Sequence, residues 1–235
     1  MALSWVDGSR YHWTKPVPRD CPILNSRFEI LVRQYVPLEE RINYSFKNKV
    51  FLVQAFTHGS FPSTMRDGIG HMRPLDFLGD AAIKFLLTVH LYGCIEPLTS
   101  YALTLTRQRV ECNRFFGFLV VRHGWHKFLR CGSSTLNDDI VKYVKSVSRK
   151  DYEDTVDCRP PKPLADVFES LAAAIYLDSN LNLDIVWNVV YPILQSQIQR
   201  ELCEVSRRCK TPSSYQEGTE ETSDQSTTES VVSNR

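Results

Sequence analysis

The sequence lacks several features that would place it quickly. Charge is almost balanced, with 28 Lys and Arg against 27 Asp and Glu, so composition alone does not indicate a polyanionic partner. The seven cysteines are an odd number without a Cys-x-x-Cys pair, which argues against a disulfide framework or a zinc ribbon and favours reduced thiols. No apolar run is long enough and free enough of charge to span a membrane. Internal repeats and strand-type alternation are also absent.

The N-terminus lacks the charged-then-apolar pattern of a signal peptide. It contains Asp7, Asp20 and few arginines, which gives little support to a mitochondrial presequence. We therefore expect an intracellular protein, cytoplasmic or nuclear, with a mitochondrial location as the weaker alternative. The initial Met and the polar ending favour a whole, small protein.

Composition divides the chain into three parts. Residues 1–26 contain two tryptophans and three prolines and are expected to form an irregular arm. Residues 27–207 form a single all-α domain in this prediction, and residues 208–235 form a disordered, acidic tail rich in Ser and Thr. The expected helices cover about residues 27–35, 38–42, 46–57, 74–92, 97–121, 134–147, 162–178 and 183–205, the last kinked or broken at Pro192.

Two of these helices carry acids on otherwise apolar surfaces. In the helix near residues 74–92, Asp76 and Asp80 are four residues apart and therefore share one face. The helix at 162–178 places Asp166 and Glu169 on one face in the same way. Burying unpaired carboxylates costs several kcal/mol, and the chain has no obvious matching pair of buried arginines. A hard cation such as Mg²⁺ would offset this cost, so the pattern predicts a metal-dependent phosphodiester hydrolase site.

Several blocks resemble one known family. The stretch LDFLGDAAIKFLLTVHLY (residues 75–92) is similar to the ribonuclease III signature, and PKPLADVFESLAAAIYLDS (161–179) to that family's second motif. INYSFKNKVFLVQAFTHGS, CNRFFGFLVVRHGWHKFLR and LDIVWNVVYPILQ resemble, more narrowly, the second ribonuclease III domain of the Dicer enzymes. The resemblance runs from about residue 42 to 195 in ordered blocks.

The resemblance implies a ribonuclease III-type helical endonuclease domain that cleaves double-stranded RNA and leaves 5′-phosphate and 3′-hydroxyl ends. Asp76, Asp80, Asp166 and Glu169 would hold Mg²⁺, with Mn²⁺ as a substitute, and Asp80 and Glu169 would be catalytic. It places Arg107 and Asn113 in a helix that supports the site and faces RNA. Ordinary solvated positions are the alternative for these two residues.

The resemblance also implies a pair of domains, since one such site cuts one strand. Phe77 lies where relatives pack across the dimer interface. We expect a homodimer, with a heterodimer containing another ribonuclease III domain as the alternative, and no membrane partner. Without its acidic end the chain is mildly basic, which permits an RNA partner. No helicase or PAZ-like segment and no double-stranded-RNA-binding domain is evident, so binding would depend on the catalytic domain.

Three positions depart from the family pattern. Asp76 stands where the family has Glu and is shorter by one methylene, so it is expected to have difficulty reaching the metal. Arg73 replaces a common Glu, and Lys84, one turn after Asp80, is expected to pair with it and weaken metal binding. The alternative hypothesis is therefore a catalytically impaired domain that acts as an RNA-binding or dimerisation scaffold. A protein-binding helical module is a third possibility. For His58, a capping or core hydrogen-bonding role is expected.

Overall fold

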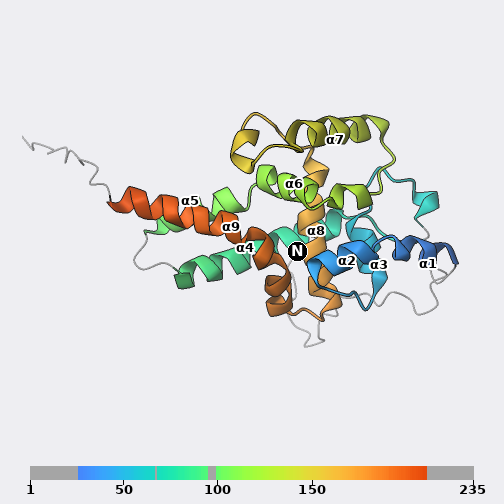
Figure 1. Cartoon of the computed structure of the whole chain (residues 1–235). Coiled ribbons are helices and arrows are strands. Elements are labelled where there is room, and N and C mark those ends of the chain that lie inside the picture. The colour runs from blue at the N-terminus through green and yellow to red at the C-terminus, as the bar shows by residue number, and fades with distance from the viewer. Residues whose placement is uncertain (1–25, 67, 95–98, 211–235) are drawn as a thin grey trace, which may run out of the picture.

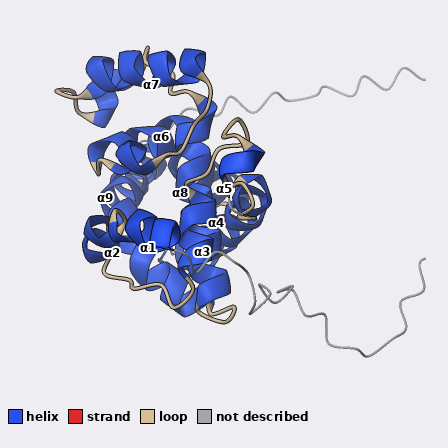
Figure 2. Ribbon diagram, turned by 90° about the vertical axis from the view of Figure 1, so that its right-hand side faces the viewer, coloured by secondary structure: helices blue, strands red, loops and turns tan. Residues whose placement is uncertain are grey.

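The structure is a computed structural model that describes residues 26–66, 68–94 and 99–210, and these residues are almost entirely helical (Figures 1 and 2). The α-helices are α1 Ser26–Arg33, α2 Val36–Ile42, α3 Lys49–Ala55, α4 Arg73–Cys94, α5 Ser100–Val110, α6 Asn113–Arg122, α7 Ser134–Val147, α8 Lys162–Asp178 and α9 Leu183–Lys210. Short 3₁₀ turns lie at η1 Ser63–Met65, η2 Trp125–Phe128 and η3 Tyr152–Thr155. Extended pairing within the described part is limited to one isolated bridge between Thr57 and Arg130. The all-α prediction is confirmed.

Helix α8 is the centre of the fold. It is buried along almost its whole length, and α3, α4 and α6 pack around it (Figure 1). Its apolar character on every side is typical of a helix that lies in a core. Helix α7 forms an outer layer above α6 in both views (Figures 1 and 2). The two acid-bearing helices are therefore a central helix, α8, and one that crosses it, α4.

Gly79 sets the closeness of the crossing between α4 and α8. A Cβ atom at this position would lie 1.8 Å from the main-chain oxygen of Glu169, so only glycine permits the two backbones to touch. The start of α4 is tied down by a second contact. The carbonyl of Met72 accepts hydrogen bonds from the Asp76 N–H at 2.8 Å and from the buried Ser170 hydroxyl at 3.2 Å. These contacts bring the acids of α4 next to those of α8.

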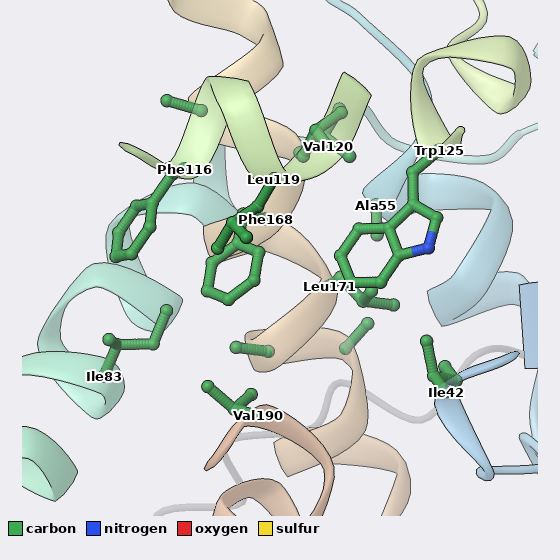
Figure 3. Packing of buried hydrophobic residues seen from close by; sticks show 14 of the residues in the cluster. Ile42, Ala55, Ile83, Phe116, Leu119, Val120, Trp125, Phe168, Leu171 and Val190 are labelled. Atoms are coloured by element: carbon green, nitrogen blue, oxygen red, sulfur yellow. The ribbon is translucent and has the colours of Figure 1, made fainter. Parts of the chain in front are cut away.

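Aromatic packing holds the other side of α8. Phe168 stacks on Phe116 of α6, with ring centroids 4.6 Å apart, and on Trp125 of η2 at 6.0 Å (Figure 3). Such pairs contribute about 0.5–1.5 kcal/mol each beyond the burial of their surface. Phe116 and Trp125 are each 1% exposed. The packing fixes α6 and η2 against the helix that carries Asp166 and Glu169.

Two predicted helices differ from the structure. The single helix expected over residues 97–121 is wrong, because α5 ends at Val110 and α6 begins at Asn113. Between them Cys112 adopts an extended conformation (φ −91°, ψ 144°), which turns α6 onto α8. The helix expected over residues 46–57 is shorter, since Asn48 caps its start by accepting a hydrogen bond from the Val50 N–H at 3.0 Å.

Of the two alternatives expected at Pro192, a kink or a break, the break is wrong. Helix α9 continues through this exposed residue to Lys210, and the kink stays a prediction. Most of the predicted arm (residues 1–25) and of the predicted tail (residues 211–235) lies outside the described residues. None of the helices that the structure describes is long and apolar enough to cross a membrane.

Candidate metal centre

Three of the four predicted acids meet where α4 crosses α8. Asp76 lies in the first turn of α4, and Asp166 and Glu169 lie on successive turns of α8. One carboxylate oxygen from each of the three lies within 4.8 Å of the others. Asp166 and Glu169 are buried, and Asp76 is partly buried. Three carboxylates in this arrangement offer the oxygen ligands that a hard divalent cation prefers.

The electrostatics of this three-acid group favour the arrival of a positive charge. Burial raises the pKa of Glu169 to about 9, together with a hydrogen bond to Asp76 and the charges of Asp76, Asp80 and Asp166. Burial also raises the pKa of Asp166, although the hydrogen bond from Lys162 opposes this effect. Glu169 therefore carries a proton at neutral pH unless a cation replaces it. A bound metal ion would release that proton.

Asp76 reaches the other acids despite its short side chain. Its carboxylate is one of the three that lie within 4.8 Å of one another. The expectation that the missing methylene limits the reach of Asp76 towards a metal ion stays a prediction. The close crossing at Gly79 and the hydrogen bond from Ser170 to Met72 bring the start of α4 next to α8.

Asp80 lies next to the three-acid group but is held by Lys84. The Lys84 ammonium donates a hydrogen bond to Asp80 Oδ2 at 2.7 Å, which confirms the pairing expected from their spacing. Both side chains are roughly half exposed, at 45% for Lys84 and 40% for Asp80. The hydrogen bond that Lys84 donates to Asp80 raises the pKa of Lys84 more than burial lowers it. The fourth acid thus has a counter-ion of its own.

A lysine that the sequence analysis missed neutralises two of the three acids. The Lys162 ammonium forms an ion pair and hydrogen bond with Asp166, one turn further along α8, and lies 3.8 Å from Asp76 Oδ2. Burial lowers the pKa of Lys162, but the contacts with Asp166 and the charge of Asp76 outweigh it and raise the value overall. The spacing of Lys162 and Asp166 was a usable signal. The contact of Lys162 with Asp76 could not be predicted in this way, because it depends on how the two helices cross.

A cavity of about 520 Å³ opens beside the acids. It is lined by His58, Met72, Arg73, Asp76, Lys162, Pro163 and Asp166. Basic side chains thus face the same space as two of the carboxylates. His58 has the hydrogen-bonding role expected for it, since its Nδ1 lies 2.8 Å from the Ser60 hydroxyl, but it also borders this cavity. The cavity can accept an anionic group next to a metal ion.

The structure places the two predicted RNA-facing residues differently. Arg107 is half-buried, donates to the Thr88 hydroxyl at 3.0 Å and lies 3.6 Å from Glu111. Its guanidinium therefore bridges α4 and α5 rather than standing free. Asn113 is exposed at the first residue of α6. Glu111 is a second residue that the sequence analysis missed. Its side chain is nearly buried, and burial raises its pKa overall, although the charges of Arg107 and Lys84 oppose this effect.

Helix α4 also presents an apolar face to solvent. Phe77 is 81% exposed, and Phe85, Val89 and Tyr92 follow at helical spacing with 56%, 55% and 79% exposed. We call these four residues the α4 stripe. A contiguous row of large exposed apolar side chains is uncommon on a monomer and is typical of an interaction surface. The stripe begins one residue after Asp76 of the three-acid group.

Comparison with known proteins agrees with this geometry. A sequence model described as "Ribonuclease III domain" matches residues 73–180, which include all four acids. The chain is 36% identical to "Endoribonuclease Dcr-1" of Drosophila melanogaster over 205 residues, which is 79% of this chain and 9% of that protein. It is 35% identical to "Endoribonuclease Dicer" of Danio rerio over 217 residues, 84% of this chain and 12% of that protein. The chain thus spans about a tenth of the length of these curated relatives.

A solved structure shares the fold. The nuclease domain of ribonuclease III from Campylobacter jejuni, described for flexibility in a region involved in dimer formation, superposes with a TM-score of 0.53. The match covers 69% of this chain and 97% of the other, at 20% identity. The helical architecture, the acidic crossing of α4 and α8, and the relatives at about 35% identity lead to one assignment. The chain belongs to the ribonuclease III family.

Proposed function

We propose that the chain is a metal-dependent endoribonuclease that cleaves double-stranded RNA and leaves 5′-phosphate and 3′-hydroxyl ends. The observation that carries the proposal is the three-acid group, in which Asp76, Asp166 and Glu169 converge within 4.8 Å inside a ribonuclease III domain. The names of the relatives are those of endoribonucleases. A buried acid whose pKa is raised by burial and by neighbouring carboxylates, as for Glu169, is suited to a divalent cation.

The residues fit Mg²⁺, with Mn²⁺ as a substitute. Asp76, Asp166 and Glu169 would hold the ion, and Asp80 would join them once its contact with Lys84 loosens. A bound ion would supply an activated water and would stabilise negative charge on the phosphate. Asp80 and Glu169 are the acids to which we assign the catalytic role.

The cationic residues of the cavity have a separate task. Lys162 and Arg73 border the space in which a phosphate would lie, and they supply positive charge there. When a cation takes over neutralisation of Asp166, the Lys162 ammonium becomes available to that phosphate. The cavity therefore favours a phosphodiester over a neutral substrate.

We further propose that the α4 stripe pairs two copies of the domain. One site cuts one strand, so a duplex requires two sites that face opposite strands. The stripe adjoins the metal site, and the Campylobacter jejuni neighbour is described as having a region involved in dimer formation. A homodimer is the arrangement we favour. A second, different ribonuclease III domain would use the same surface.

The test is cleavage of an end-labelled RNA duplex in Mg²⁺ by the wild-type chain, by Glu169→Gln and by Asp139→Asn. Asp139 is an exposed acid on α7 whose loss leaves the site unchanged, so it controls for the removal of one negative charge. Cutting that requires metal, disappears in Glu169→Gln and persists in Asp139→Asn supports the proposal. Phosphatase treatment and ligation of the products would identify their ends. Failure of the wild-type chain to bind Mg²⁺ or Mn²⁺ in calorimetry would refute it.

A second candidate function is a scaffold that binds RNA or dimerises without cutting. The observation in its favour is that lysines already neutralise three of the four acids: Lys84 pairs with Asp80, and Lys162 contacts both Asp166 and Asp76. This hypothesis predicts salt-sensitive retention of duplex RNA without cleavage, even in Mn²⁺ and at high protein concentration. A protein-binding module would show no affinity for the duplex at all.

A further inference from the structure

A second cavity lies away from the acids, between the end of α6, η2, α7 and the last turn of α2. Its volume is about 660 Å³. Five of its lining residues are basic, and none of the lining residues is acidic: Arg41, Arg122, His123, His126 and Lys127. We call it the basic cavity. The assigned active site does not use it, since none of its residues borders the cavity beside Asp76 and Asp166.

Contacts with the core hold part of the basic cavity in place. Arg41 donates a hydrogen bond to the main-chain oxygen of His123 at 2.8 Å. Gly124, in the left-handed region at φ +73°, leaves room for this guanidinium, which would lie 3.2 Å from a Cβ atom there. The His123 ring packs against Trp125, with centroids 5.3 Å apart, and Trp125 is buried. An anion would therefore meet basic groups that are already positioned.

The basic groups lie close enough to repel one another. Burial lowers the pKa of His123, and the charges of Arg41 and Arg122 lower it further. Burial also lowers the pKa of His126; a hydrogen bond with the backbone of Val120 opposes this effect, and the charge of Lys127 adds to it. Asp151 lies 3.9 Å from Arg122, but 80% of its side chain is exposed, so water screens that pair. The lowered pKa values favour the neutral forms of the two histidines, so the positive charge of the cavity comes from Arg41, Arg122 and Lys127, and its lining includes no acid.

Part of the cavity wall is apolar. Phe118, Val121, Val144 and Val147 line this part. A cavity lined by both cationic groups and apolar side chains suits a phosphate ester that carries a flat or apolar body. Among such ligands a nucleotide unit has both parts, and the family of this chain makes RNA the relevant source.

We infer that the basic cavity binds the phosphate group of a nucleotide. Arg122 and Lys127 contact the phosphate from the rim, Arg41 from the floor, and the sugar or base lies on the apolar wall. The choice of an RNA strand as the source rests on the proposed function, whereas a free nucleotide would supply the same chemistry. The site adds a second point at which a strand is held, apart from the cleavage site.

The experiment measures binding without cleavage, in EDTA. Fluorescence anisotropy with a labelled RNA duplex compares wild type, the cavity variant Arg122→Gln/Lys127→Gln and a control, Arg33→Gln/Lys145→Gln. All four residues are exposed, and each variant removes one Arg and one Lys, so the change in net charge is matched. We expect the cavity variant to bind about tenfold more weakly and to lose roughly one to two units from the salt dependence. The control should change by less than about twofold.

A second arm identifies the source of the phosphate. Uridine 5′-monophosphate and inorganic phosphate are titrated against each protein, with thermal unfolding as the readout. Loss of duplex affinity in the cavity variant alone assigns RNA. Unchanged duplex affinity with nucleotide stabilisation lost only in that variant supports the phosphate site with a free nucleotide as its ligand. Equal behaviour of cavity variant and control in both arms overturns the inference.

The outcome is independent of catalysis. A chain that fails to cut RNA but shows these differences refutes the proposed nuclease and leaves the phosphate site standing. If the chain cuts RNA but both variants bind the duplex and the nucleotide equally, the proposed nuclease stands and the phosphate site is refuted.

Discussion

Lys84→Gln should strengthen metal binding at the acidic crossing while leaving the fold intact. The ion pair between Lys84 and Asp80 is half exposed and joins residues four apart on one helix. Such pairs contribute only about 0.3–0.5 kcal/mol to stability, so the free energy of unfolding should hardly change. The metal site responds more strongly, because the substitution releases a carboxylate next to the three-acid group and removes a competing positive charge.

The size of the effect follows from charge and exposure. In a water-like environment two unit charges about 4 Å apart interact by roughly 1 kcal/mol, and a divalent ion doubles this to about 2 kcal/mol. Reorientation of Asp80 offsets part of it, which leaves about 1.4 kcal/mol, or roughly tenfold in affinity. Each lysine that neutralises an acid in this site therefore weakens binding of the ion by a measurable factor.

Isothermal calorimetry with Mn²⁺ and Mg²⁺ measures this directly. Lys142→Gln is the matched control, because Lys142 pairs with Asp139 at 3.4 Å on the exposed side of α7. We expect Lys84→Gln to bind about tenfold more tightly, or to take a second ion, and the control to match wild type. Equal affinity and stoichiometry in all three proteins would refute the view that Lys84 competes for Asp80. Cleavage at low Mg²⁺ should rise in parallel.

Three further outcomes are expected. Gly79→Ala should destabilise the domain by roughly 1–3 kcal/mol or more in urea unfolding, because its Cβ would overlap the backbone of Glu169. The control Gly93→Ala should be neutral or stabilising, because the space around its Cβ is open. An intact Gly79→Ala domain would contradict the close crossing. Metal affinity should rise with pH up to about 9, because Glu169 must lose a proton to bind the ion, and the stability of the metal-free protein should fall over the same range because the native state binds that proton more tightly than the unfolded chain. Calorimetry in buffers of different ionisation enthalpy would detect the released proton. The absence of proton release would argue against the raised pKa. Val89→Asp on the α4 stripe should yield monomers in sedimentation velocity and Val141→Asp on α7, of similar exposure, should not; equal effects would remove the stripe as the interface.

Local signals were enough for the helices themselves. The predicted bounds of residues 134–147 and 162–178 agree with α7 and α8, because a Ser-rich cap and a proline in the first turn mark their starts. The break at Cys112 carries no such mark. It exists because α6 must turn to pack against α8, which is a tertiary requirement.

The membership of the acidic site also depended partly on local sequence signals and partly on tertiary packing. Four acids were visible as two pairs at helical spacing, and the spacing also predicted the pairing of Asp80 with Lys84. That Asp76 joins Asp166 and Glu169 depends on the crossing of the two helices at Gly79. Four basic residues of the basic cavity lie together in residues 122–127, but the part played by Arg41 has no local signal. Arg41 is 81 residues from Arg122 in sequence and reaches the cavity because Gly124 leaves room for its guanidinium. In our proposals the acidic crossing holds the metal ion and the basic cavity, whose lining includes no acid, holds a phosphate of the strand. If both sites act as proposed, metal affinity will respond to Lys84 and strand affinity to Arg122 and Lys127, and neither change will alter the other.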